Sequence, residues 1–134
     1  MRKIKEIIVH CSASDVDSHD NIRTIRKWHL EYGWDDVGYH FYINKNGVLE
    51  FGRPIDKIGA HTKGHNKGSI GICLGGNINF PDIQIEFALR FIGFLMRAFD
   101  VKLKDVKGHY EYTKKKTCPN IPMDQFRSNI KEIL

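Results

Sequence analysis

The chain has 134 residues, of which 41% are hydrophobic and 28% are charged, as in an ordinary water-soluble globular protein. This length predicts one domain, residues 1–134, with a core of its own. No stretch approaches the roughly 18 apolar residues that span a bilayer, so no membrane insertion is predicted. The formal net charge of +5 favours an anionic partner, such as nucleic acid, acidic lipid or an acidic cell-wall polymer.

The cysteines and the N-terminus indicate where the protein is made. Cys11, Cys73 and Cys118 form an odd and sparse set, which excludes a disulfide framework and favours thiol or metal chemistry in a reducing compartment. The first residues are basic, as in a signal peptide, but the apolar run that follows is only Ile7 to Val9. We therefore expect a protein without a signal peptide that is cytoplasmic as synthesised.

The first predicted elements are a strand and a helix. Ile4 to Val9 is a short apolar run of the kind found in buried strands. The helix that follows is predicted to begin after Asp20, as its N-cap, and to end at Gly33. Its buried face is expected to hold Ile22, Ile25, His29 and Tyr32.

The remaining elements complete an α/β pattern. Residues 38–52 predict a hairpin around Asn46-Gly47, and residues 69–74 predict a strand. A long helix near Pro81 carries so many apolar residues, including three phenylalanines on an adjacent face, that we expect it to be largely buried. Asp105–Gly108 and Met123–Leu134 predict a short strand and a last helix. The fold class is therefore α/β, a single domain with a central mixed β-sheet flanked by helices.

Several side chains have the chemistry of zinc ligands: His10, His40, His61, His65, His109 and Cys118. A catalytic zinc site uses three protein ligands and leaves the fourth position open. His10 and Cys11 are neighbours on the predicted strand and point to opposite faces, so only one is expected to face a site. The same alternation separates Tyr39 from His40. His10 also stands at the C-terminal end of its strand, where α/β folds place ligands.

Each candidate also has a plainer interpretation. A lone histidine is most often a surface residue or a hydrogen-bonded core residue. Cys73 lies within an apolar strand and is most simply a small buried hydrophobe. The run Lys114–Lys116 fits a solvated loop. Spacing alone therefore leaves the set of metal ligands open.

Four motifs, taken in order, are more informative than any single residue. They are IIVHCSAS, IRKWHLEYGWDDVGYHFYINKNGVLEFGRP, GAHTKGHNKGSIGICLGGN and GHYEYTKKKTCPN. In this order and spacing the sequence resembles the zinc-dependent N-acetylmuramoyl-L-alanine amidases of the bacteriophage T7 lysozyme type, which share a fold with peptidoglycan recognition proteins. The resemblance runs from about Ile7 to Pro119, most of the chain.

The resemblance implies a zinc site in a surface groove, with His10, His109 and Cys118 as ligands. A histidine and a cysteine nine positions apart would then bracket a loop that folds back on the first strand. Cys73 stands where some branches of the wider family carry a glutamate base. Glu111 stands where the family often has aspartate, so the resemblance leaves the surroundings of His109 unassigned.

The resemblance also implies the residues that act beside the metal. Tyr39 and Lys116 match the family's catalytic tyrosine and lysine, with Lys116 expected to stabilise the oxyanion and Tyr39 left between several roles. His61 matches a histidine that lines the substrate groove and is not a metal ligand. Asn66 and Lys67 belong to the same segment, so we expect them to help bind substrate.

The implied activity is zinc-dependent hydrolysis of the amide bond between N-acetylmuramic acid and L-alanine. The partner would be peptidoglycan or a muropeptide, bound by a monomer. Three settings fit this activity: a bacteriolytic endolysin from a phage or prophage, a cytoplasmic amidase that recycles wall fragments, and a secreted toxin. The one-domain layout favours the endolysin.

Other classes of protein fit the residues less well. A non-catalytic peptidoglycan-binding module on the same fold is the alternative, but loss of activity in that branch accompanies loss of the ligand cysteine, and Cys118 is present. A nucleic-acid-binding protein would fit the charge, yet the chain lacks a base-reading basic helix or an aromatic RNA-binding motif, so no nucleic acid partner is expected. A purely structural zinc site is disfavoured because only three ligands are implied.

Overall fold

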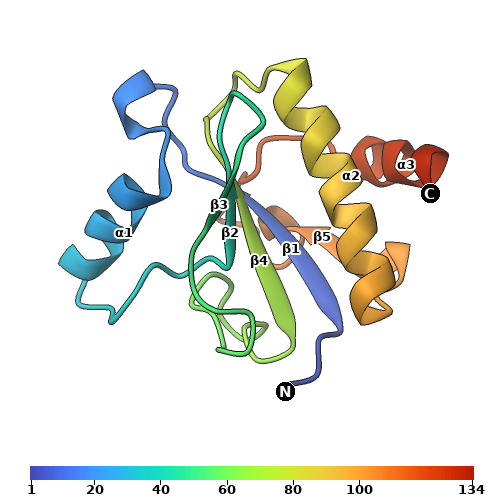
Figure 1. Ribbon diagram of the computed structural model, residues 1–134, viewed down its shortest axis with the longest axis horizontal. Coiled ribbons are helices and arrows are strands. Elements are labelled where there is room, and N and C mark those ends of the chain that lie inside the picture. Colours follow the sequence, from blue (N-terminus) through green and yellow to red (C-terminus); the bar gives the residue numbers. More distant parts are fainter.

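The structure, a computed structural model, describes all residues from 1 to 134 and contains one five-stranded sheet. The strands are β1 (Glu6–Cys11), β2 (Phe41–Ile43), β3 (Leu49–Phe51), β4 (Ser69–Leu74) and β5 (Val106–Gly108). The helices are α1 (Ile22–Glu31), α2 (Asp82–Phe99) and α3 (Met123–Ile133) (Figure 1). The predicted single domain with a mixed sheet and flanking helices is confirmed.

Strand β1 lies inside the sheet, whose order is β3-β2-β4-β1-β5. It runs parallel to β4 and β5, and β2 is parallel to β4, whereas β2 and β3 pair antiparallel. The hairpin predicted around Asn46-Gly47 is therefore confirmed. Because β1 and β5 are parallel, with Val9 opposite Gly108, both strands reach the same edge of the sheet at their C-terminal ends.

The two faces of the sheet bury different residues. Ile7 and Val9 of β1 belong to a large core with residues of α2 and α3, and alternate residues of β4 join them. On the other face, Tyr42 and Cys73 pack against residues of α1 in a smaller cluster. Figure 1 shows α1 on one side of the sheet and the pair α2 and α3 on the other. Burial on both faces explains why β4 is apolar from Ile70 to Leu74.

Helix α1 begins and ends close to the predicted residues, with two corrections. The N-cap is Asn21, whose side chain accepts the Thr24 N–H at 2.8 Å, and the predicted cap Asp20 is wrong. The Asp20 carboxylate instead accepts a hydrogen bond from the Tyr42 hydroxyl at 2.8 Å. At the other end, Tyr32 is exposed, because the helix ends at Glu31 and the chain turns at Gly33, whose φ is +94°.

Helix α2 is less buried than its composition predicts. One stripe packs against the sheet and α3, including the fully buried Ala88 and Ile92. Phe87 and Phe91 are only half-buried, and Phe94 is 63% exposed. The reason is that a helix covering one face of a sheet buries one stripe, and no second layer covers the rest. No helix in the chain combines the length and apolar character that a membrane crossing requires.

Candidate active site

Three side chains of types that can bind a metal ion meet at the C-terminal ends of the parallel strands. His10 is near the end of β1, His109 follows β5 directly, and Cys118 lies on the loop that returns toward β1. Their ligand atoms all lie within 4.8 Å of one another, and no other group of this kind occurs in the chain. The predicted candidates His40 and His65 lie outside it. We call these three residues the ligand triad.

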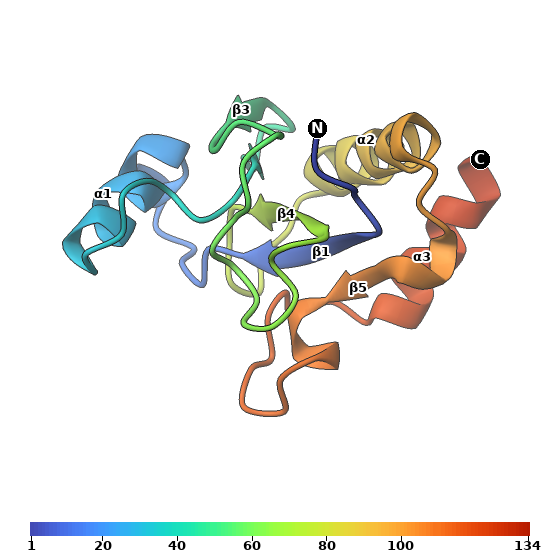
Figure 2. The same cartoon turned by 90° about the horizontal axis from the view of Figure 1, so that it is seen from below.

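Backbone hydrogen bonds hold the returning loop in place. The Tyr110 N–H donates to the Cys118 carbonyl at 2.9 Å, so the residue after His109 is joined directly to the cysteine. The Cys11 N–H donates to the Cys118 sulfur at 2.9 Å. Figure 2 shows this loop (orange) extending from the sheet on the side away from α2. The expectation that only one of His10 and Cys11 faces the site is therefore too strict, since β1 ends at Cys11 and its backbone contacts the site.

A chain of hydrogen bonds orients the His10 ring. His10 Nε2 lies 2.9 Å from His61 Nδ1 and 3.2 Å from Thr62 Oγ1. His61 Nε2 in turn lies 3.1 Å from Ser69 Oγ. The contacts are satisfied when each ring carries its proton on Nε2, so that His10 donates to His61 and His61 donates to Ser69. This tautomer leaves the lone pair of His10 Nδ1 free for a metal, and the partner of Nε2 fixes the ring.

The electrostatics of the triad also fit a metal site. Burial, together with His61 and His109, lowers the pKa of His10 well below its ordinary value. Burial lowers the pKa of His61 to about 3. Both rings are thus neutral at pH 7, and neutral imidazole is the form that binds metals. Contact with the Cys11 thiol and burial raise the pKa of Cys118, so a cation binding its sulfur must displace the proton.

A groove runs over the triad. One cavity of about 400 Å³ is lined by Tyr39, Lys115 and Lys116 as well as the triad. A second, of about 570 Å³, shares Tyr39, His109 and Lys116 with the first and reaches Trp34. The Tyr39 ring lies 5.0 Å from the His10 ring, and burial raises the pKa of Tyr39 well above its ordinary value. Its phenol therefore keeps its proton and is a hydrogen-bond donor beside the triad.

Comparison with known proteins agrees with this geometry. The profile of the family described as N-acetylmuramoyl-L-alanine amidase matches residues 1–121. The chain belongs to this amidase family. The endolysin of Escherichia phage T7 is 36% identical over 128 residues, covering 90% of this chain and 83% of the relative. The endolysin of Enterobacteria phage K11 is 39% identical over 109 residues, covering 81% and 70% of the two chains.

Solved structures resemble the amidase over nearly its whole length. N-acetylmuramoyl-L-alanine amidase LysC from Clostridium intestinale superimposes with a TM-score of 0.86 at 27% identity, covering 97% of this chain and 87% of the other. Drosophila PGRP-LB superimposes with a TM-score of 0.74 at 28% identity, covering 89% and 76%. The predicted resemblance to T7-type amidases is confirmed. The chain is an enzyme that hydrolyses the amide of peptidoglycan.

The predicted groove residues of the amidase lie in two different places. Asn66 borders the larger of the two groove cavities, and its side-chain oxygen accepts the N–H groups of His61 and Thr62 at 2.9 and 2.8 Å. It thus holds the loop that carries His61. Lys67 does not border either groove cavity, but lines a separate cavity at the opposite edge of the sheet. The neighbouring side chains of Asn66 and Lys67 thus lie on different cavities.

Some residues that support the amidase site were not predicted from the sequence. Thr62 contacts the His10 ring and Ser69 contacts the His61 ring. Neither residue type indicates a functional site from sequence alone. Gly71 does give a signal, because glycine inside a strand often marks a close approach. A side chain at Gly71 would place its Cβ 2.5 Å from the His61 ring. Lys63, which borders the larger groove cavity, was also missed.

Glu111 has a structural partner and does not contact the triad. Its carboxylate accepts two hydrogen bonds from the Arg127 guanidinium, at 2.7 and 3.0 Å. It also accepts the Gly108 N–H at 2.9 Å. The residue two positions after His109 therefore fixes α3 against the end of β5, which positions His109 only indirectly.

Proposed function

We propose that this amidase is a zinc enzyme in which His10, His109 and Cys118 hold the ion. The observation that carries the proposal is the convergence of their ligand atoms within 4.8 Å. Two histidines and one cysteine form a typical donor set for zinc and leave the fourth position open for catalysis. The hydrogen bond from His10 to His61 supports it further, because it occupies Nε2 of His10 and leaves Nδ1 free for an ion.

Two polar side chains complete the proposed chemistry. His10, His109 and Cys118 would hold a zinc ion, which when bound would supply the Lewis-acid chemistry that activates water near neutral pH. Lys116 borders both groove cavities and is proposed to donate a hydrogen bond to the oxyanion of the tetrahedral intermediate. The raised pKa of Tyr39 makes its phenol a donor in the same role, and a poor base.

The proposed substrate path follows the groove on both sides of the triad. Its two cavities, of about 400 and 570 Å³, meet at Tyr39, His109 and Lys116. The substrate is proposed to be the amide between N-acetylmuramic acid and L-alanine, with glycan and stem peptide lying to either side. His61 borders the larger cavity and is proposed as a positioning residue for His10 that also faces the substrate. Asn66 supports it.

The proposed biological role is that of an endolysin. The curated relatives include the endolysins of phages T7 and K11, and the chain spans 83% and 70% of their lengths. A recycling amidase or a secreted toxin would use the same chemistry. Lysis of cells that express the protein together with a membrane pore, and no lysis without the pore, is the outcome that the endolysin role predicts.

Zinc content tests the proposed ligands directly. Purified protein is expected to contain one zinc per chain by elemental analysis, and His10→Ala is expected to lose it. The matched control is His61→Ala, which removes a neighbouring imidazole that the proposal does not count as a ligand. It should still contain zinc when purified, with an affinity for zinc about 10–100-fold lower because His61 orients the His10 ring. If His61→Ala loses zinc while His10→Ala keeps it, the ligand set is wrong. A protein that binds peptidoglycan without cleaving it would instead be a binding module.

A further inference from the structure

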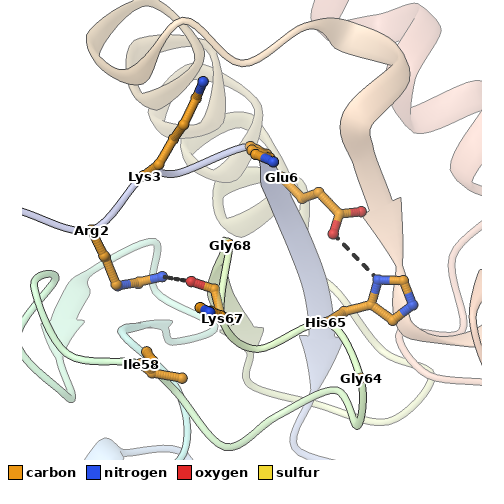
Figure 3. Close-up of a pocket in the computed structure, with 9 residues that line it drawn as sticks. Arg2, Lys3, Glu6, Ile58, Gly64, His65, Lys67 and Gly68 are labelled. Carbon is orange, nitrogen blue, oxygen red and sulfur yellow. Dashed lines mark hydrogen bonds and ion pairs between the residues drawn. The ribbon is translucent and has the colours of Figure 1, made fainter.

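A basic cavity lies at the edge of the sheet opposite the ligand triad. It has a volume of about 570 Å³ and is formed at the N-terminal ends of β1 and β4 (Figure 3). Its lining includes four cationic side chains, Arg2, Lys3, Lys5 and Lys67. The parallel pairing of β1 and β4 places these ends together and away from His10. We call it the basic cavity.

The first residues of the chain are fixed against the wall of this cavity. The Arg2 guanidinium donates to the carbonyls of Ile55 at 3.0 Å and Ser69 at 2.9 Å. The Lys5 N–H donates to the Gly68 carbonyl at 2.7 Å. Chain termini are commonly mobile unless they are held in this way. Arg2 therefore acts as an anchor that sets the backbone positions of Lys3 and Lys5.

The ammonium groups of the cavity are available to a ligand. Lys3, Lys5 and Lys67 are exposed, and none makes a side-chain hydrogen bond or ion pair in the structure. The one acid in the lining, Glu6, is engaged elsewhere. Its carboxylate accepts the Tyr112 hydroxyl and lies 3.3 Å from His65 Nδ1, the contact drawn in Figure 3.

The lining also defines what such a ligand would contain. Separate lysines act as point charges and suit a chain of spaced negative charges. The cavity has a single apolar residue, Ile58, and its one aromatic ring, His65, is already stacked on Tyr112 with centroids 3.7 Å apart. No ring is therefore free to stack on a nucleobase, the contact that single-stranded nucleic acid sites use.

We propose that the basic cavity binds a base-free polyanion whose negative charges are spaced along a chain, as in a polyol phosphate. Lys3 and Lys5 on the anchored arm and Lys67 on the facing segment would contact successive phosphates. The site lies apart from the groove and does not depend on the proposed zinc chemistry. It would hold the amidase on anionic polymer while the groove remains open to peptidoglycan.

Calorimetry with a trimer of glycerol phosphate tests the proposal, using the zinc-loaded protein at low ionic strength. We expect saturable binding, weakened about tenfold in Lys3→Gln/Lys5→Gln, since two unit charges are removed from the site. The matched control Lys102→Gln/Lys131→Gln removes the same charge from exposed lysines elsewhere and should change the affinity less than about twofold. Equal weakening in both variants would overturn the site in favour of general charge.

Two further measurements keep the result specific. Lys67→Gln alone, on the facing segment, is expected to weaken binding about threefold. A trinucleotide of equal charge should bind no more tightly than the glycerol phosphate trimer, and a tenfold preference for it would overturn recognition without bases. Amidase activity of Lys3→Gln/Lys5→Gln should match that of the parent, so failure of this proposal is distinguishable from failure of the zinc proposal.

Discussion

Polar side chains at the two ends of the parallel strands differ in burial and in hydrogen bonding. At the C-terminal end, His10, His61 and Cys118 are held by hydrogen bonds to one another or to neighbours, and burial keeps both imidazoles neutral. At the N-terminal end, Lys3 and Lys5 are exposed, and their ammonium groups have no partner.

The difference shows what each kind of chemistry requires of a fold. A metal site needs neutral donors in fixed positions, which burial and hydrogen bonds supply. A site for a polyanion needs charge that stays hydrated until the ligand arrives, so exposed lysines on an anchored backbone are sufficient. Only at the metal site does function depend on the position of single atoms. Substitutions at the metal site should therefore reduce function more than substitutions at the polyanion site.

The largest expected effect is loss of the metal. Cys118→Ser is expected to lose zinc and to lower amidase turnover by roughly 10³-fold or more, because activation of water depends on the ion. Cys11→Ala is the matched control, because it removes the neighbouring thiol but keeps the backbone N–H that donates to the Cys118 sulfur, and it should retain zinc and activity. Elemental analysis and an assay with purified peptidoglycan measure both variants. Full activity in Cys118→Ser would contradict the proposed triad.

The next effect separates catalysis from metal binding. Lys116→Ala is expected to keep its zinc and to lower turnover by about 10²–10³-fold, the usual cost of losing one oxyanion donor. Lys115→Ala removes the neighbouring charge, which borders only one of the two groove cavities, and should be close to the parent. Steady-state kinetics with a soluble muropeptide distinguishes them. Reversed results would assign the role to Lys115.

His40 tests whether a buried histidine at the N-terminal end of the parallel strands has a lowered pKa, as His10 and His61 do. Burial lowers its pKa to about 4, and its ring accepts the Gly71 N–H at 3.0 Å and donates to the Lys57 carbonyl at 2.8 Å. The neutral ring stabilises the fold fully above the unfolded pKa near 6.5. Below that pH the unfolded chain takes up the proton first, so stability falls.

When the pH falls from 7 to 5, His40 is expected to lower the free energy of unfolding by about 2 kcal/mol. His40→Gln keeps a donor and an acceptor but does not titrate, so its free energy of unfolding should fall by about 2 kcal/mol less over this range. Urea unfolding of both proteins at the two pH values measures the difference. Equal pH dependence would show that His40 titrates normally in the fold.

The smallest expected effect concerns the link between the two ends. The Tyr112 hydroxyl donates to Glu6 and its ring stacks on His65, joining the loop of Lys116 to the loop of His61. Tyr112→Phe keeps the stacking and loses a hydrogen bond worth about 1 kcal/mol. We expect KM to rise about threefold with kcat unchanged, since the groove walls are held less firmly.

Tyr110→Phe is the control for this prediction. Its hydroxyl accepts the Met123 N–H at 2.9 Å at the start of α3, away from the groove, so its loss should lower stability without changing KM. A KM that rises in Tyr110→Phe and not in Tyr112→Phe would contradict a positioning role for Tyr112. Thermal unfolding and steady-state kinetics are measured on both variants.

The fold could be predicted where the signal was local. Asn46-Gly47 alone specifies the hairpin, and the apolar run from Ile70 to Leu74 specifies a strand buried on both faces. The helix cap could not be predicted, because Asp20 and Asn21 are both good capping residues. Which of the two caps the helix depends on Tyr42, 22 positions from Asp20, whose hydroxyl donates a hydrogen bond to the Asp20 carboxylate.

Only the site residues that match positions of the family's motifs could be predicted from the sequence. The triad His10, His109 and Cys118 follows from resemblance, and the structure brings the three together. The position of Lys67 does not follow, because the direction of a side chain in a loop depends on how the chain enters the next strand. Thr62 was missed for a similar reason, since its contact with His10 spans 52 positions.

Product analysis with and without metal tests the central claim most directly. Purified protein is incubated with peptidoglycan, with and without a zinc chelator, and the released ends are identified by mass spectrometry. Free L-alanine amino termini are expected in the untreated sample, none after chelation, and recovery when zinc is restored. Release of the same termini at the same rate after zinc has been removed would contradict it.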